Sequence, residues 1–410
     1  MNILLSAYAC EPLLGSEPGV GWNWAVQIAK RGHNVWVITR PMHKAKIDDF
    51  LLKNENQYLS NRMNFIYYDL SIWKRKRGGG GTHFHYILWQ LGIVRVAKKL
   101  LQIESIDYIH HITFVTTRFP SFLCYLNTPF VFGPVAGGEK PPSVLKQDYP
   151  LVCKFKDIIR EFSNNLVKLN PFIKLTFAKS HKIYTTSEQT KDLIPKKYHS
   201  KVESTLAIGS ENILVDMELK NILQKDESIK VLFVGNLLYW KGVHLALKAF
   251  KEFKKNSPNA TFTIIGNGSE KRWLKSIASK MDLSDCVIWL DKMDRDQLLE
   301  EYENYNIFLF PSLQDSGGMV VIEALSRGLP VVSLDIGGPG LVVDSSCGRK
   351  VSTMHRTQED IVFELANSLQ EVSRKEEISK LSLNAKQRAK TFTWENIIDR
   401  VYNNLEKDFN

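Results

Sequence analysis

The stretch Asn306–Gly338, NIFLFPSLQDSGGMVVIEALSRGLPVVSLDIGG, predicts a strand, a loop, a helix, a turn and a second strand. Ile307–Phe310 and Pro330–Leu334 are apolar runs of strand length. Met319–Arg327 has the composition of a helix, and Gly328 stands where a C-cap glycine belongs. Because both strands are apolar except for Ser333 and do not alternate with polar residues, the stretch is typical of a parallel sheet that is covered on both faces.

Glu323 does not fit a plain core helix. Its neighbours are apolar, and a buried carboxylate needs a partner because leaving it unpaired is costly. Arg327, four residues later, would supply that partner in a purely structural helix pair. A ligand with hydroxyl groups is the other candidate, and the glycines at the start of the same helix suit a phosphate. The spacing alone leaves the structural and the binding interpretation open.

The same stretch resembles the retaining glycosyltransferases of family four, which belong to the glycosyl transferases group 1. Their pattern has two glutamates separated by seven residues, followed by Ala, a small residue, Gly, Pro and two valines. Here Asp315 stands at the first acidic position and Glu323 at the second, and Gly328–Val332 completes the pattern. The resemblance implies an α/β protein of the GT-B fold, in which two Rossmann-like domains face a central cleft and the C-terminal helix crosses back to the N-terminal domain.

Length and resemblance together predict the domain organisation. At 410 residues the chain is long for a single hydrophobic core, so two domains are expected. We predict an N-terminal acceptor-binding Rossmann-like domain at 1–209 and a linker at 210–229. A C-terminal nucleotide-sugar-binding Rossmann-like domain would follow at 230–391, and a helix that packs back on the N-terminal domain at 392–410.

Composition and charge bear on location and partners. No apolar run approaches the ~18 residues of a membrane span, and we expect the amino terminus to form a strand and not a signal peptide. Five scattered cysteines lack metal-binding spacing and fit a reducing compartment, so a cytoplasmic location is expected. The formal net charge of +10 favours an anionic partner: a nucleotide, a membrane surface or nucleic acid.

Ile72–Gln102 is a candidate membrane-binding segment. It contains the basic run Lys74–Arg77 and the glycines Gly78–Gly81, which predict a mobile loop. Its aromatic residues are Trp73, Phe84, Tyr86 and Trp89. Cations with aromatic residues are typical of a patch on an anionic membrane, which would make the protein peripheral on the inner face of the cell membrane. A solvated loop before an ordinary core helix remains the alternative. Nucleic acid is disfavoured because the aromatic and basic residues do not alternate.

In the N-terminal half, three places are candidate parts of a substrate site. A glycine loop follows the first predicted strand, where doubly wound folds bind ligands, and the resemblance implies that Glu17 contacts the acceptor and Gly19 the donor. The strand Asp107–Thr113 carries His110 and His111, whose side chains point to opposite faces. The resemblance favours His111 as the catalytic histidine near the donor sugar, with His110 as the second choice. The glycine turn Gly137, Gly138 and Glu139 is a further predicted acceptor contact, although these residues could serve only the turn.

In the C-terminal half, the resemblance places the donor. Lys241, directly before a predicted helix, matches the family's phosphate-binding lysine. Asn236 stands where the family usually has arginine, so a neutral donor replaces a cation there. The remaining predicted donor contacts are Gly266, Met293, Ser316, Gly317, Gly318, Met319 and Glu323. The string Asp294–Asp296 resembles a metal-binding motif of the other glycosyltransferase fold, but we interpret Asp294 and Gln297 as a helix capping box and expect no metal and no cofactor.

The predicted reaction is transfer of a hexosyl unit from a nucleotide diphosphate sugar to a hydroxyl of a glycan or lipid-linked acceptor, with retention. The acceptor would attack the face from which the diphosphate leaves, so the protein would mainly orient the reactants and stabilise charge. Lys241 would hold the leaving phosphate, Glu323 the ribose, and Asp315 with the Ser316–Gly318 amides the sugar hydroxyls. Family habit suggests a bacterial surface polysaccharide as the product. A nucleotide-sugar 2-epimerase of the same fold and a non-catalytic nucleotide-sugar-binding protein remain alternatives.

Overall fold

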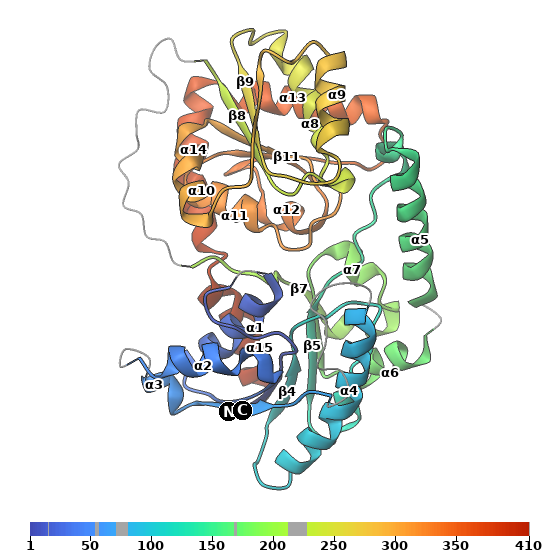
Figure 1. Cartoon of the computed structure of the whole chain (residues 1–410), viewed down its shortest axis with the longest axis vertical. Coiled ribbons are helices and arrows are strands. Elements are labelled where there is room, and N and C mark those ends of the chain that lie inside the picture. Colours follow the sequence, from blue (N-terminus) through green and yellow to red (C-terminus); the bar gives the residue numbers. More distant parts are fainter. Residues whose placement is uncertain (15, 54–56, 71–80, 168–169, 212–227, 410) are drawn as a thin grey trace. The chain divides into compact units, whose positions relative to one another are not determined.

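The computed structural model describes residues 1–14, 16–53, 57–70, 81–167, 170–211 and 228–409 (Figure 1). The chain divides into two compact units. Unit 1 comprises residues 1–138, 162–208 and 394–410, and unit 2 comprises residues 139–161 and 209–393. Residues 139–161, predicted to belong to the N-terminal domain, therefore cluster with unit 2. Most of the predicted linker lies outside the described residues.

Unit 1 is built on a parallel sheet, with seven strands among the described residues. Side by side, they are β3 (Met63–Tyr67), β2 (Asn34–Thr39), β1 (Asn2–Ser6), β4 (Tyr108–His111), β5 (Phe130–Val135), β6 (Lys182–Thr185) and β7 (Val202–Ser204). Its helices are α1 (Ser16–Lys30), α2 (Lys44–Leu51), α3 (Gln57–Ser60), α4 (Gly81–Leu100), α6 (Pro171–Lys179), α7 (Glu188–Asp192) and α15 (Trp394–Phe409). Helix α5 (Leu151–Val167) begins in unit 2 and ends in unit 1.

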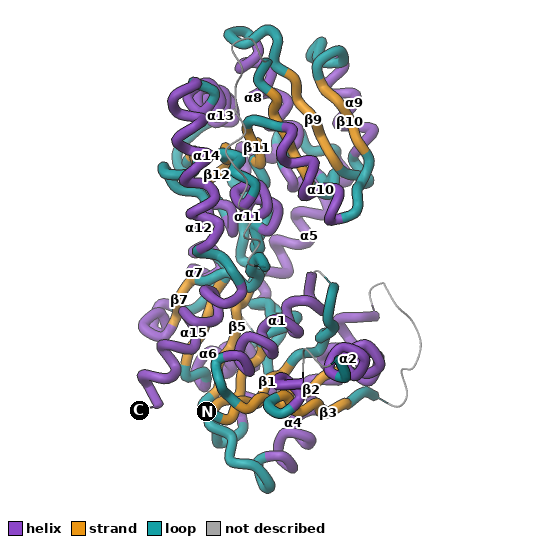
Figure 2. The backbone as a smooth tube through the Cα atoms, turned by 90° about the vertical axis from the view of Figure 1, so that its left-hand side faces the viewer, coloured by secondary structure: helices purple, strands orange, loops and turns teal. Residues whose placement is uncertain are grey.

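Unit 2 repeats this architecture with a parallel sheet of six described strands. In spatial order they are β10 (Val287–Leu290), β9 (Thr261–Ile265), β8 (Lys230–Val234), β11 (Ile307–Phe310), β12 (Val331–Leu334) and β13 (Gly348–Val351). Its helices are α8 (Val243–Lys254), α9 (Lys271–Lys280), α10 (Arg295–Glu301), α11 (Met319–Ser326), α12 (Gly337–Val342), α13 (Gln358–Val372) and α14 (Lys375–Lys390). Figure 2 shows helices flanking the strands of each unit. Both sheets have the Rossmann-like order in which the first strand lies between the second and the fourth.

The two histidines of β4 show how helices cover both faces of the unit 1 sheet. His110 contacts Trp24 of α1 and Tyr402 of α15, whereas His111 hydrogen-bonds Tyr86 of α4. Because neighbouring strand residues point to opposite faces, α1 and α15 cover one face and α4 the other.

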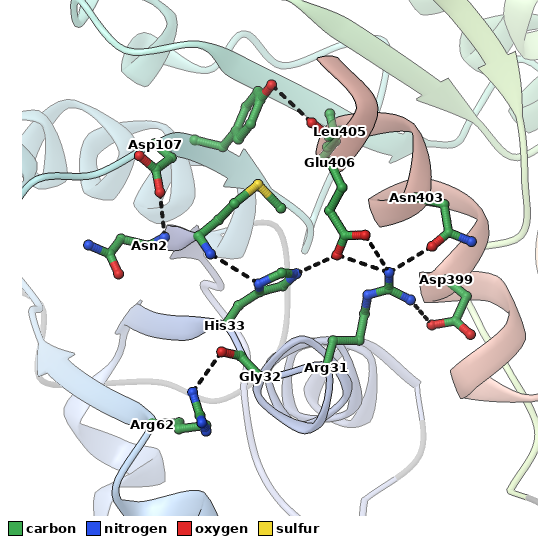
Figure 3. Close-up of polar contacts among 12 residues, drawn as sticks. Asn2, Arg31, Gly32, His33, Arg62, Asp107, Asp399, Asn403, Leu405 and Glu406 are labelled. Atoms are coloured by element: carbon green, nitrogen blue, oxygen red, sulfur yellow. Dashed lines mark hydrogen bonds and ion pairs between the residues drawn. The ribbon is translucent and has the colours of Figure 1, made fainter. Parts of the chain in front are cut away.

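The C-terminal helix α15 packs on α1 within unit 1, as predicted. The guanidinium of Arg31, at the end of α1, donates to Asp399, Asn403 and Glu406 of α15 (Figure 3). His33 lies between Glu406, at 2.9 Å, and the N-terminal amino group, at 3.2 Å. These contacts join the last helix of the chain to the first βα unit.

The predicted membrane segment is only partly described, and two of its aromatic residues are wrongly assigned. Tyr86 and Trp89 are fully buried in the core of unit 1, because α4 packs that face against the sheet. Phe84 is exposed, and Gly81 is the first residue of α4 rather than part of a loop. Trp73 and residues 74–80 lie outside the described residues. The alternative of an ordinary core helix is therefore correct for Tyr86 and Trp89.

Candidate functional site

Asp315 organises the amino end of α11. Its Oδ1 accepts hydrogen bonds from the backbone N–H of Gly317, at 3.1 Å, and Gly318, at 2.8 Å. Its Oδ2 accepts one from Lys241 Nζ at 2.5 Å. The predicted site residues Asp315, Gly317 and Gly318 thus lie together with Lys241, the predicted catalytic lysine. Since a carboxylate has about four lone-pair positions, the three donors hold its orientation and leave room for one more.

Lys241 reaches Asp315 because the loops after β8 and β11 are in backbone contact, with Leu313 N–H donating to the carbonyl oxygen of Trp240. These strands are neighbours in a parallel sheet, so their carboxyl ends meet at one edge. Gly242 follows the 3-10 helix η6 (Tyr239–Lys241) with φ of 73°. A methyl group on Gly242 would lie 1.8 Å from the carbonyl oxygen of Pro311, so glycine is required for this approach.

The loop after β12 closes on the same place. Gly338 N–H donates to the carbonyl oxygen of Asp315 at 2.7 Å. Gly337 has φ of 61°, and a methyl group on it would lie 2.3 Å from that oxygen and 3.5 Å from Glu139 Cγ. The buried Glu139 therefore lies beside this loop, within unit 2. Loops after three strands converge on Asp315.

Glu323 is buried in α11, and its predicted structural partner is wrong. Arg327 pairs with Glu303 at 2.9 Å instead. The cation nearest to Glu323 is the half-exposed Arg295, whose Nε lies 3.6 Å from Oε1. Burial raises the pKa of Glu323, against the opposing effects of Arg295 and of a hydrogen bond with the Tyr302 hydroxyl. Glu323 is 9% exposed, and a carboxylate with one hydrogen bond and one long ion pair has unused capacity to accept hydrogen bonds.

The other predicted donor contacts lie along the same edge of the unit 2 sheet. Gly266 follows β9, and a methyl group on it would lie 2.0 Å from the carbonyl oxygen of Gly235, so its loop touches the one that carries the exposed Asn236. Ser316 and Met319 are half-buried on either side of the two glycines. Met293 lines an open hollow of ≈ 600 Å³ with residues of α10 and of the 3-10 helix η7 (Tyr302–Asn304).

In unit 1, the glycine loop forms the start of α1. A methyl group on Gly19 would lie 1.9 Å from the carbonyl oxygen of Leu14, so this position requires glycine for packing. Glu17 Oε2 accepts a hydrogen bond from the Phe114 N–H at 2.8 Å, which ties α1 to the loop after β4. The Glu17 carboxylate, which is predicted to contact the acceptor, is therefore already hydrogen-bonded within the protein.

His111 is enclosed within unit 1. Its side chain is fully buried, with Nε2 2.7 Å from the Tyr86 hydroxyl and Nδ1 2.9 Å from Ser6 Oγ. Burial lowers its pKa to about 3, and that of His110 to about 4. His110 is bonded at both nitrogens as well, to Tyr402 and to the carbonyl oxygen of Gly133. In this geometry both histidines link core elements, and neither presents a ring nitrogen to a sugar.

The glycine turn after β5 is partly occupied by internal contacts. Gly138 N–H donates to Thr190 Oγ1 at 3.2 Å, and a methyl group on Gly138 would lie 2.4 Å from Thr190 Cα. Gly137 has φ of 101°. Both glycines are needed for the turn itself, which was the alternative left open from the sequence.

Sequence reasoning missed the support that α5 gives to this site. Asp157 is buried, pairs with Lys146 at 2.6 Å and accepts from Gln314 Nε2 at 3.4 Å, next to Asp315. From the sequence, Arg295 carries no signal beyond its place in the Asp294–Asp296 string. Asp294 is the N-cap residue of α10, but its side chain makes no capping hydrogen bond, so the predicted capping box is absent. A signal for Asp157 existed only in its position on the polar face of a helix.

The site combines a fixed cation, backbone N–H donors and two carboxylates at the carboxyl edge of a parallel sheet. Such an edge favours negative charge because of the helix dipole, and here the Asp315 carboxylate already accepts from the N–H groups of Gly317 and Gly318. Among the described residues, no group of three or more His, Cys, Asp or Glu side chains is placed to hold a metal ion. The chemistry suits binding of a phosphate ester that also carries hydroxyl groups.

Solved structures share this fold. Sucrose-phosphate synthase from Thermosynechococcus elongatus has a TM-score of 0.64 at 17% identity, covering 100% of this chain and 99% of that chain. HepE from Anabaena, in complex with UDP and glucose, has a TM-score of 0.57 at 16% identity, covering 98% and 99%. The chain has the GT-B fold of such glycosyltransferases, as predicted.

Sequence comparison relates the C-terminal part of the chain to a family. Residues 216–388 match the model of the family Glycosyl transferases group 1. An uncharacterized glycosyltransferase of Haemophilus influenzae is 32% identical over 179 residues, 43% of this chain. The match spans 48% of that relative's length. Retention stays a prediction. Along the described residues, every helix is too short or too polar to span a lipid bilayer.

Proposed function

We propose that the chain transfers a hexosyl unit from a nucleotide diphosphate sugar to a hydroxyl of a glycan or lipid-linked acceptor, with retention of configuration. The setting would be the cytoplasm, in the synthesis of a bacterial surface polysaccharide. The observation that carries the proposal is the buried Glu323 carboxylate, in the same helix whose amino end holds Asp315 and Lys241. HepE, a protein of the same fold, was solved with UDP and glucose, which are the two halves of such a donor.

Each group has a distinct proposed role. Lys241 and the amino end of α11 would receive the diphosphate, because a lysine cation and a helix dipole supply positive charge without a metal ion. Glu323 would accept hydrogen bonds from the ribose hydroxyls. Asp315, held by three donors, would offer its remaining lone pair to a hydroxyl of the transferred sugar.

The other predicted contact residues have lesser roles in this proposal. Glu139 is the predicted acceptor residue that belongs to unit 2, where it lies beside Gly337 and the Asp315 loop. His111 would act only by positioning Tyr86 and Ser6, because both of its ring nitrogens are engaged. Exposed Asn236 would donate a neutral hydrogen bond to the phosphates.

The test is incubation of the purified chain with a panel of nucleotide diphosphate sugars, with and without hydroxyl acceptors. Bound nucleotide is scored by mass spectrometry and the product by NMR, which reports the anomeric configuration. A glycoside with the donor's configuration is expected. A glycoside of inverted configuration would contradict retention. Free sugar epimerised at carbon 2 without an acceptor would favour the epimerase, and binding without turnover the non-catalytic protein.

A further inference from the structure

Helix α5 exposes a continuous apolar stripe. The stripe consists of Leu151, Val152, Phe155, Ile158, Ile159 and Phe162. Each of these side chains is between 52% and 83% exposed. At about 100° per residue, the six positions fall within an arc of roughly 120° on one side of the helix. Large apolar side chains exposed singly are ordinary, but a contiguous set on one face marks an interaction surface.

The opposite side of α5 explains why this stripe faces outward. Cys153 and Asp157 are buried, and Asp157 pairs with Lys146 and Arg160. Cys153 Sγ lies 3.7 Å from Glu270 Oε1. The polar face of this amphipathic helix is therefore the one fixed to unit 2, which reverses the usual arrangement of a surface helix.

The charges around the stripe select its partner. Lys154 and Lys156 fall about 40° beyond its two borders, by the same helical geometry. Of the acidic residues here, Asp157 is buried on the far side of α5 and is paired with Lys146 and Arg160. Glu161 lies next to Lys154 at the border, but its charge is already offset by ion pairs with Lys146 and Lys140. Two copies of the stripe would bring lysines against lysines without an acid to offset them. An anionic surface would meet both lysines favourably, and the net charge of +10 adds to that attraction.

We propose that α5 docks this chain onto an anionic lipid bilayer, with the apolar stripe in the acyl boundary and Lys154 and Lys156 at the headgroups. A helix of this kind lies in the plane of the interface, and lysine side chains extend from its borders to lipid phosphates. The inference extends the proposed function, since a lipid-linked acceptor would be met at such a surface. It does not require glycosyl transfer, so it is tested without donor or acceptor.

The test is co-sedimentation of the full chain with phosphatidylcholine vesicles that contain or lack phosphatidylglycerol. The intact chain should bind the anionic vesicles, and added salt should weaken binding. Phe155→Glu with Ile159→Glu should reduce the vesicle affinity by about a hundredfold, because two anchors become anions. Phe363→Glu is the matched control, since Phe363 is a 57% exposed phenylalanine on another helix of unit 2, and it should bind as the intact chain does.

A second variant keeps the test valid if the double glutamate variant misfolds. Lys154→Glu with Lys156→Glu changes only border residues and should weaken binding to anionic vesicles about tenfold. Circular dichroism verifies the fold of each variant. Absence of vesicle binding, or equal binding by the folded stripe variant, would overturn the proposal. So would a dimer in sedimentation velocity that the stripe variant abolishes, because the stripe's occupant would then be a second copy.

Discussion

At the scale of the residue, Glu323 is the informative group. The residue is 9% exposed, and its ion pair to the half-exposed Arg295 side chain is long. Burial raises its pKa, so the folded protein favours the uncharged form more than the unfolded chain does. A group held at a cost to stability is typical of a functional site.

Glu323→Gln should therefore stabilise the protein at neutral pH. With the folded-state pKa raised above its ordinary value of 4.5, the folded state binds more protons in the window between the two values. Stability from this group is complete below the unfolded pKa and is lost as pH rises through the folded pKa. In denaturant unfolding, the variant should have a larger free energy of unfolding than the original protein at neutral pH. The two values should be equal at acid pH. A variant less stable than the original at neutral pH would show that the carboxylate is structural.

At the scale of the element, three loops at the carboxyl edge of the unit 2 sheet make the site. Their approach depends on backbone contacts that leave no space for a side chain at Gly242, Gly337 or Gly338. The helix α11 then presents its amino end to this place, with Asp315 as the common partner of Lys241 and two N–H groups.

Gly242→Ala should destabilise unit 2 by about 2 kcal/mol or more, because it adds a clash to an unfavourable positive φ. Gly32→Ala is the matched control. Gly32 has φ of 90°, but nothing lies within 4 Å of an added methyl group, so only the backbone strain of about 1–2 kcal/mol applies. Denaturant unfolding of both variants measures the difference. Equal losses would mean that the contact between the loops is not tight.

Gly242→Ala should also lower affinity for a nucleoside diphosphate, whereas Gly32→Ala should not. The displaced loop carries Lys241 away from Asp315, and the site loses its fixed cation. Isothermal titration of the two folded variants tests this. Unchanged affinity in Gly242→Ala would remove Lys241 from the phosphate site.

At the scale of the whole molecule, the sequence predicted the fold well because buried parallel strands are short apolar runs. Ile307–Phe310 is β11 as predicted, and Met319–Arg327 differs from α11 by one residue. Contacts distant in sequence were not predictable. The burial of His111 depends on Ser6 and Tyr86, and Arg327 prefers Glu303 of η7 over its own helix.

The orientation of α5 could not be predicted from the sequence either. An apolar period of this kind is ordinarily that of a core-facing helix, and the attachment of the opposite, polar face to unit 2 involves Glu270, which is distant in the sequence. The donor-site residues were predictable only through the resemblance to the family. The spacing of the residues alone did not decide between a structural and a binding role for Glu323.

Removal of residues 394–410 should unfold unit 1. Six buried side chains of α15 would be lost: Trp394, Ile397, Ile398, Val401, Tyr402 and Leu405. At roughly 1.5–3 kcal/mol each, their burial contributes on the order of 10 kcal/mol, comparable to the stability of a domain. Hydrogen exchange should show loss of protection in β1 and β4 with β8 and β11 retained. Unaltered protection of β1 would contradict the role of α15 in unit 1.

The central claim is that Glu323 binds the ribose of a nucleotide donor, and titration of Glu323→Gln with a nucleoside diphosphate tests it most directly. Loss of a charge-assisted hydrogen bond should weaken binding about tenfold or more while the fold persists. Glu359→Gln, an exposed acid on α13 of the same unit, should bind as the original protein does. Equal affinity of the Glu323 variant and the original chain would contradict the claim.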